Sequence, residues 1–175
     1  MADNIYLVGF MGTGKSSVGR ELAKRQNKEF IDLDHLIELE EGRKISDIFA
    51  KEGESHFRGI ETRILRKVSK KNAAVIACGG GIVIIEDNVR IMKESGRIFC
   101  LTAEPETILQ RTKNNSERPL LNVADPKAQI ELLLKKRAPY YKLADEIIDT
   151  TNDSIPEVVQ KLLKSISGLE KEKND

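Results

Sequence analysis

The sequence predicts an α/β fold of three layers, in which helices cover both faces of a parallel sheet. Short apolar segments alternate along the chain with amphipathic stretches of helical period, which is typical of such folds. The apolar segments are nearly continuous, as in strands that are buried on both faces. A glycine-rich junction at residues 9–16 joins the first segment of each kind. With 175 residues, the chain is long enough for a single domain with a substantial core.

The individual elements follow in order from this alternation. Strands are predicted at residues 5–8, 30–33, 74–78, 98–101 and 146–149, where short apolar runs occur. Helices are predicted at residues 16–25, 35–41, 46–51, 55–69, 87–95, 104–113, 126–142 and 155–167. Residues 113–125 are polar, contain Pro119 and show no period, so we predict a mobile lid that excludes water. The charged residues 168–175 are expected to form a frayed tail.

Composition and charge argue against several classes of function. Lys and Arg number 29 against 28 Asp and Glu, and this balance disfavours a surface that binds nucleic acid. The apolar runs are too short to cross a bilayer, and the N-terminus lacks the pattern of a signal peptide. Cys78 and Cys100 stand in apolar segments, which predicts unpaired core thiols in a reducing cytoplasm. Since no segment suggests a subunit interface, a monomer is expected.

The glycine-rich junction has the pattern G-x-x-x-x-G-K-S of a P-loop. Its glycines permit positive φ angles, so that successive N–H groups form an anion-binding nest at the start of a helix. The Lys15 ammonium suits β- and γ-phosphate oxygens, and the Ser16 hydroxyl suits Mg²⁺. The predicted nucleotide-binding residues of this segment are Gly12, Thr13, Gly14, Lys15, Ser16 and Ser17. The alternative is a glycine-rich turn with an incidental lysine.

Two carboxylates, Asp32 and Asp34, stand at the end of the second predicted strand. In an open parallel sheet, ligands bind beyond the carboxyl ends of the strands, which places both residues beside the P-loop. Alternation along a strand would direct the two side chains to the same side. We predict that Asp32 holds the outer coordination sphere of Mg²⁺ and that Asp34 faces an acceptor hydroxyl. The alternative is that the pair caps the following helix.

A glycine triplet and several arginines complete the candidates. The triplet follows the third predicted strand and consists of Gly79, Gly80 and Gly81. It could offer backbone N–H groups to a ligand, and a loose turn is the alternative. Arg58, Arg118 and Arg137 lie outside the strong helix faces. Arginine binds carboxylate or phosphate bidentately, and Arg118 in the predicted lid could arrive on closure. For each arginine taken alone, a solvated surface charge is the alternative.

The ordered set of these motifs resembles the shikimate kinase family. The resemblance covers residues 4–165 and rests on the P-loop, the aspartate motif, the segment 42–61, the glycine triplet, and the segments 118–121 and 137–140. Each motif alone is weakly specific, whereas the ordered set is strongly specific. Arg111 is similar to the family's adenine-stacking arginine, and residues 151–156 match its partner loop only approximately.

The resemblance implies a P-loop kinase fold of the nucleoside-monophosphate-kinase type, with a five-stranded parallel sheet in the order 2-3-1-4-5. It also implies Mg²⁺-dependent transfer of a phosphoryl group from ATP to the 3-hydroxyl of shikimate, in the biosynthesis of chorismate and aromatic amino acids. The implied catalytic residues are Lys15, Asp34 and Arg118. Arg58 and Arg137 would bind the shikimate carboxylate, and residues 79–81 would offer N–H groups to the acceptor. Arg111 and Arg118 would bind nucleotide.

The residues themselves leave rival hypotheses open. Another kinase on the same fold, acting for example on gluconate or a nucleoside monophosphate, would share the P-loop. A nucleotide-dependent switch would carry an Asn-Lys-x-Asp signature, which is missing from this sequence. A degenerate kinase that serves only as an interaction domain would have lost Lys15, Asp34 or an arginine, yet all are present.

Overall fold

The structure is a computed structural model that describes residues 3–113, 121 and 123–171. Its sheet contains the strands β1 (Asn4–Val8), β2 (Glu29–Asp32), β3 (Ala74–Ala77), β4 (Gly96–Thr102) and β5 (Glu146–Asp149). The strand order is β2-β3-β1-β4-β5, and each neighbouring pair runs parallel. The predicted five-stranded parallel sheet and its order are therefore confirmed.

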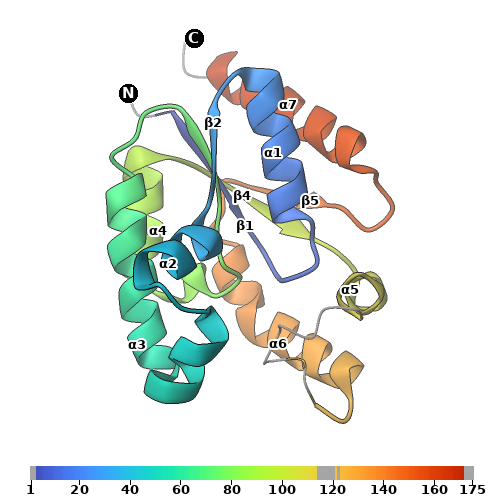
Figure 1. The fold of residues 1–175 in the computed structure, drawn as a ribbon. Coiled ribbons are helices and arrows are strands. Elements are labelled where there is room, and N and C mark those ends of the chain that lie inside the picture. The colour runs from blue at the N-terminus through green and yellow to red at the C-terminus, as the bar shows by residue number, and fades with distance from the viewer. Residues whose placement is uncertain (1–2, 114–120, 122, 172–175) are drawn as a thin grey trace.

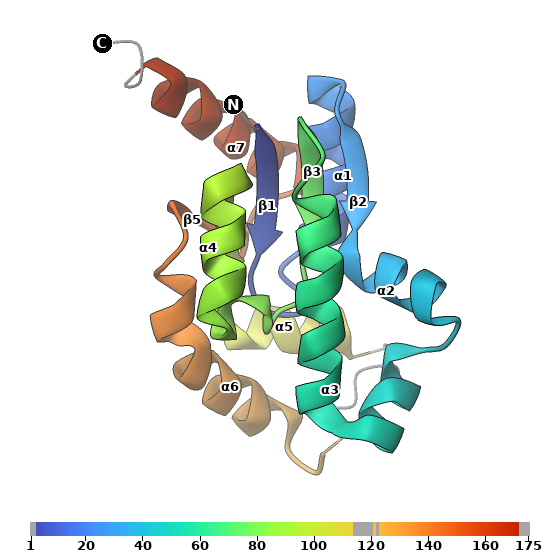
Figure 2. The ribbon, with the colours of Figure 1, turned by 90° about the vertical axis from the view of Figure 1, so that its left-hand side faces the viewer.

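Helices cover the sheet on both faces, as predicted. They are α1 (Lys15–Gln26), α2 (Leu33–Glu41), α3 (Ile45–Val68), α4 (Glu86–Ser95), α5 (Pro105–Thr112), α6 (Pro126–Tyr141) and α7 (Ile155–Lys171), together with the 3-10 turn η1 (Ile82–Ile84). Figure 1 shows α1 and α7 on one side of the sheet and α3 and α4 on the other. Figure 2 shows α2, α5 and α6 at the end of the sheet toward which the strands run.

The central strand β1 joins the two halves of the core. Tyr6 and Val8 pack on the face that α3 and α4 cover, whereas Ile5 and Leu7 pack on the face that α1 and α7 cover. None of these four side chains is more than 4% exposed. Burial on both faces explains why the strand is continuously apolar, because both sets of alternating side chains lie in a core.

Several boundaries differ from the predicted ones by a few residues, and two of the differences have a clear local cause. Strand β2 ends at Asp32, because the Asp32 carboxylate accepts a hydrogen bond from the N–H of His35 at 3.2 Å and caps α2. Leu33 therefore begins a helix and does not end a strand. The predicted helices 46–51 and 55–69 form one element, α3, which is broken at Gly53 by backbone angles of φ 81° and ψ 175°.

The C-terminal helix is longer than predicted, since α7 runs to Lys171 and so includes the start of the predicted tail. Residues 172–175 of that tail lie outside the described residues, as do residues 114–120 and 122 of the predicted lid. In the part of the chain that is described, no helix has the length and apolar character needed to span a membrane. Cys78 and Cys100 are buried free thiols, as predicted.

Candidate active site

A cavity of about 630 Å³ opens at the carboxyl ends of the parallel strands. Segments from six regions of the chain meet there, as the switch-point position in an open sheet predicts. The predicted site residues that line it are Gly12, Gly14, Lys15, Ser16, Ser17, Asp32, Asp34, Arg58, Gly79, Gly80, Gly81, Arg111 and Arg137. The tertiary structure thus brings almost all of the candidates into one chamber.

The P-loop has the backbone that its glycines predict. Gly9, Gly12 and Gly14 have φ angles of 131°, 78° and 95°, all in the region that favours glycine. Gly9 also needs to lack a side chain, because a Cβ there would lie 2.1 Å from the carbonyl oxygen of Leu101. Helix α1 begins directly after this turn, so the positive end of its dipole faces the cavity. The nest geometry favours a phosphate site over an incidental turn.

Two side chains of the P-loop donate hydrogen bonds to the same backbone carbonyl. The Thr13 hydroxyl donates to the carbonyl oxygen of Phe10 at 2.7 Å, and the Lys15 ammonium donates to the same oxygen at 2.9 Å. Thr13 is 1% exposed and does not line the cavity, so its side chain braces the loop and only its backbone is available to a ligand. The lysine, in contrast, lines the cavity.

Ser16 and Asp32 form a contact between the P-loop and strand β2. The Ser16 hydroxyl donates to Asp32 Oδ2 at 2.6 Å, while Asp32 Oδ1 caps α2 through His35. The alternative role of Asp32 as a helix cap is therefore real, and it is compatible with a role in the site. One oxygen of the carboxylate serves the helix, and the other faces the P-loop hydroxyl.

Asp34 reaches the cavity by a different route from the one expected. It lies in the first turn of α2, so alternation along a strand is not what orients it, and that part of the prediction is wrong. Its Oδ1 would be 3.1 Å from a Cβ placed on Gly79, which puts the carboxylate directly over the glycine triplet. The helix start, and not the strand, carries this candidate into the site.

Each glycine of the triplet is approached closely by a charged side chain. A Cβ on Gly79 would lie 2.7 Å from Glu61 Oε1 and 3.1 Å from Asp34 Oδ1, and one on Gly80 would lie 3.1 Å from Arg137 Nη1. A Cβ on Gly81 would lie 2.1 Å from Arg58 Nη2, so any side chain there would displace the Arg58 guanidinium. These close approaches favour a place in the site over a loose turn.

The guanidinium groups of Arg58 and Arg137 each lie beside an aromatic ring, and Arg58 also pairs with Glu54 and Glu61. Arg137 on α6 is 6% exposed, and its guanidinium lies 5.5 Å from the centre of the Phe10 ring. Arg58 on α3 lies 5.3 Å from the centre of the Phe57 ring. Neither residue is a freely solvated surface charge, so that alternative is wrong for both.

Glu61 is a site residue that the sequence did not single out for a role. It is fully buried on α3, and its Oε2 accepts a hydrogen bond from Arg58 Nη1 at 2.8 Å. Its other oxygen, Oε1, has no hydrogen-bond partner and faces Gly79. Burial raises the pKa of Glu61 to about 7, although Arg58 works in the opposite direction. Two signals in the sequence point to it: its spacing of three residues from Arg58 on a helix, and its place at the end of the segment 42–61 that carries the family resemblance.

The titration of Glu61 predicts a pH dependence of stability. Between its ordinary pKa of 4.5 and about 7, the folded state binds more protons than the unfolded state. The free energy of unfolding should therefore lose on the order of 3 kcal/mol as pH rises across this interval. Urea unfolding of Glu61→Gln should lack that decrease between about pH 5 and about pH 7.5. Glu54→Gln, which alters an exposed partner of Arg58, should keep it. If the free energy of unfolding of Glu61→Gln fell with pH as much as that of the wild type, the raised pKa would not belong to Glu61.

Arg111, the predicted adenine-stacking residue, lines the cavity and contacts the segment after β5. Arg111 Nη2 donates to the Thr150 carbonyl at 2.7 Å, and Nη1 lies 3.3 Å from the Gly12 carbonyl. The loop between β5 and α7 is held to the start of α7, because the Ser154 hydroxyl and N–H both donate hydrogen bonds to the Glu157 carboxylate. Arg118 lies outside the described residues, so its role stays a prediction.

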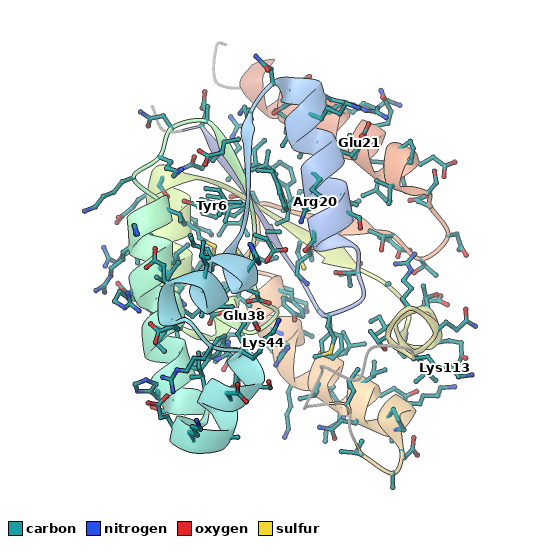
Figure 3. All side chains as sticks on the ribbon, in the orientation of Figure 1. Tyr6, Arg20, Glu21, Glu38, Lys44 and Lys113 are labelled. Atoms are coloured by element: carbon teal, nitrogen blue, oxygen red, sulfur yellow. The ribbon has the colours of Figure 1, made fainter. Side chains whose placement is uncertain are left out.

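The apolar lining of the cavity was not predicted in full. It contains Ile45, Phe49 and Phe57 from α3, and Met11 from the P-loop. At its rim, Lys44 donates to Glu38 at 3.1 Å, and Figure 3 shows the two side chains together between α2 and the start of α3. Glu38 Oε1 also accepts the N–H of Ile45 at 3.0 Å, so the pair positions the first turn of α3.

Comparisons of sequence agree on one family. The family model described as shikimate kinase matches residues 11–167. A shikimate kinase from Thermodesulfovibrio yellowstonii is 45% identical over 166 residues, covering 95% of this chain and 96% of that protein. A shikimate kinase from Pelotomaculum thermopropionicum is 44% identical over 160 residues, covering 91% of this chain and 93% of that protein.

Comparisons of structure agree with those of sequence. The solved structure of a shikimate kinase from Acinetobacter baumannii in complex with shikimate has a TM-score of 0.92 and 41% identity, covering 96% of this chain and 94% of that chain. A gluconokinase from Sinorhizobium meliloti has a TM-score of 0.65 at 15% identity, covering 98% and 95% of the two chains, and that likeness extends to the fold alone.

Proposed function

The chain belongs to the shikimate kinase family, whose reaction is phosphoryl transfer from ATP to shikimate, and we propose that the 3-hydroxyl of shikimate is the acceptor in the cavity described above. The observation that carries this proposal is the arrangement at the glycine triplet. There, two guanidinium groups and the carboxylates of Asp34 and Glu61 approach successive glycines within the chamber that also contains the P-loop. This arrangement suits a small hydroxylated carboxylate that binds beside a nucleoside triphosphate.

Arg58 and Arg137 bind the carboxylate of shikimate in this proposal. Both guanidinium groups are packed on aromatic rings and are therefore oriented before the ligand arrives, which lowers the entropic cost of binding. Glu61, which also lines the cavity, holds Arg58 through its hydrogen bond at 2.8 Å. The N–H groups of residues 79–81 complete the contacts with the acceptor.

Asp34 accepts the hydrogen bond of the 3-hydroxyl and takes its proton as the oxygen attacks the γ-phosphorus. A proton acceptor for a hydroxyl needs the right position more than a raised pKa. The Lys15 ammonium offsets the charge that spreads over the oxygens of the transferring group, and the P-loop N–H groups hold the β-phosphate. Positioning and electrostatics suffice for a loose transition state, so no covalent intermediate is proposed.

Mg²⁺ fits the contact between Ser16 and Asp32. A hydroxyl and one carboxylate that lie 2.6 Å apart and both line the cavity match the ligands of Mg²⁺, which keeps several waters and phosphate oxygens. In this proposal Ser16 would hold the ion and Asp32 would support it from the outer coordination sphere. The ion would supply positive charge that offsets the charge of the phosphate oxygens. We further propose a cytoplasmic monomer, which the two buried free thiols support with respect to compartment.

A coupled assay of ADP release tests the proposed reaction. Purified protein with ATP and Mg²⁺ is expected to release ADP when shikimate is added, and to stay at background with gluconate or nucleoside monophosphates. Phosphorus NMR of the product should place the phosphate on the 3-oxygen. ADP release that depends on another acceptor would contradict the roles of Arg58, Arg137 and Asp34 but would leave the P-loop assignment intact.

A further inference from the structure

Thr150 lies beneath the cavity lining, in contact with Thr13 of the P-loop and with Arg111. It follows β5 directly, is 2% exposed, and its N–H donates to the Thr102 carbonyl at 2.8 Å. Its hydroxyl oxygen is 3.1 Å from the carbonyl oxygen of Thr13 and 3.0 Å from that of Thr102. Arg111 Nη1 donates to the same hydroxyl oxygen at 3.1 Å. A single buried hydroxyl thus links the P-loop, the end of β4 and helix α5.

Thr150 and Arg111 together engage two consecutive carbonyls of the P-loop. The single proton of the Thr150 hydroxyl is within reach of the Thr13 and Thr102 carbonyls, and because the Thr102 carbonyl already accepts the Thr150 N–H, we assign the proton to the Thr13 carbonyl. The Gly12 carbonyl accepts from Arg111 Nη1 at 3.3 Å. Arg111 is itself held by the Thr150 carbonyl at 2.7 Å. The two side chains and the two carbonyls therefore form one connected set of contacts, which we call the carbonyl brace.

The geometry of the peptide bond converts this brace into an effect on the phosphate site. In a trans peptide, the carbonyl of one residue and the N–H of the next point in opposite directions, and the P-loop peptides are trans. Thr150 is not among the residues that line the cavity in the described part of the chain, whereas Gly14 is. A Thr13 carbonyl that is held by Thr150 therefore directs the N–H of Gly14 toward the cavity, where it belongs to the anion-binding nest.

We propose that Thr150 is a positioning residue for phosphate binding, which orients the Thr13–Gly14 peptide so that its N–H faces the phosphates of ATP. This inference rests on the proposed function for the identity of the nucleotide. Thr150 is not among the described residues that line the cavity. We therefore expect it to act on a bound phosphate through the P-loop backbone. Loss of the hydroxyl would leave the buried Thr13 carbonyl and Arg111 without this partner and would let the peptide rotate.

The experiment compares variants of Thr150 by their binding of inorganic tripolyphosphate, ATP and shikimate, each measured alone by calorimetry. Thr150→Val removes the hydroxyl at nearly constant volume, and Thr150→Ala does so without an added methyl group in case the valine variant folds poorly. Thr150→Ser keeps the hydroxyl. Thr112→Val is the matched control, because the Thr112 hydroxyl is also buried but donates to Ile108 within its own helix at 2.7 Å.

Thr150→Val and Thr150→Ala should raise the Kd of tripolyphosphate and of ATP by about tenfold each. The Kd of shikimate in the absence of nucleotide should change by less than about twofold, because the brace does not touch the glycine triplet. The Thr150→Ser and Thr112→Val variants should match the wild type for all three ligands. In the coupled assay, Thr150→Val should raise the KM for ATP with the KM for shikimate unchanged.

Two results would overturn the inference. If ATP binds more weakly but tripolyphosphate does not, Thr150 positions the segment around residues 151–156 and not the phosphate nest. If Thr150→Ser is as impaired as Thr150→Val, the hydroxyl is not the relevant group. A wild-type protein that binds ATP yet does not phosphorylate shikimate would refute the proposed function, while the tripolyphosphate comparison would still decide the role of Thr150.

Discussion

Replacement of Lys15 by alanine is expected to lower kcat in the coupled assay by about 100-fold to 1000-fold. The Lys15 ammonium lines the cavity beside the anion nest and is steadied by the Phe10 carbonyl at 2.9 Å. A charge that is aimed in advance at the transferring group needs little reorganisation, which is why its loss acts mainly on the transition state. The KM for shikimate should change much less than kcat, since this residue does not belong to the glycine triplet.

The control for this variant is Lys24→Ala, which removes a lysine from the exposed face of the same helix. It should keep wild-type kcat within about twofold, because an isolated surface charge far from the cavity contributes little. If both variants lost kcat to a similar extent, the loss would reflect the stability of helix α1 and not the charge at the transferring phosphate. Full turnover in Lys15→Ala would refute the assignment of the P-loop as the phosphoryl site.

Asp34→Asn is expected to lower kcat by about 100-fold to 10,000-fold at nearly constant affinity for shikimate. Asparagine has almost the same shape as aspartate, so the contact over Gly79 should persist, but its amide does not take the proton of the acceptor hydroxyl. Single-turnover measurements with saturating ATP would separate this chemical step from binding and product release.

The comparison variant is Asp47→Asn, which changes an exposed carboxylate in the first turn of α3 and should leave kcat unaltered. If Asp34 only orients the hydroxyl, the asparagine variant would retain hydrogen bonding and lose less than about tenfold in kcat. A loss that small would contradict the role of Asp34 as the proton acceptor.

The phosphate loop could be predicted residue by residue because its structure is local. Three glycines within eight positions dictate where φ is positive, and the strand before and the helix after place the nest at a helix N-terminus. The sheet was predictable for a similar reason, since doubly buried strands are continuously apolar. Its strand order came with the family resemblance and not from the periodicity of the chain.

Asp34 shows the limit of local inference. The residue was predicted correctly as part of the cavity, but the stated cause was wrong because one cap hydrogen bond from His35 to Asp32 starts the helix at Leu33. Helix boundaries depend on such single contacts, and a pattern of residue types does not resolve them. The glycine triplet was ambiguous in sequence, and only the close approach of Asp34, Arg137 and Arg58 favours a place in the site over a loose turn.

The sequence by itself determined the fold class, the phosphate loop and the set of charged residues available for a carboxylated acceptor. These properties follow from periodicity, from glycine conformation and from the chemistry of single side chains. Only the tertiary structure decided the parts that depend on long-range contacts. Glu61 became distinctive through its burial against Gly79 and Arg58, and Thr150 through a hydrogen bond to Thr13 across 137 positions of the chain. No local pattern encodes such contacts, because the energy of a buried polar group depends on the partners that folding brings to it.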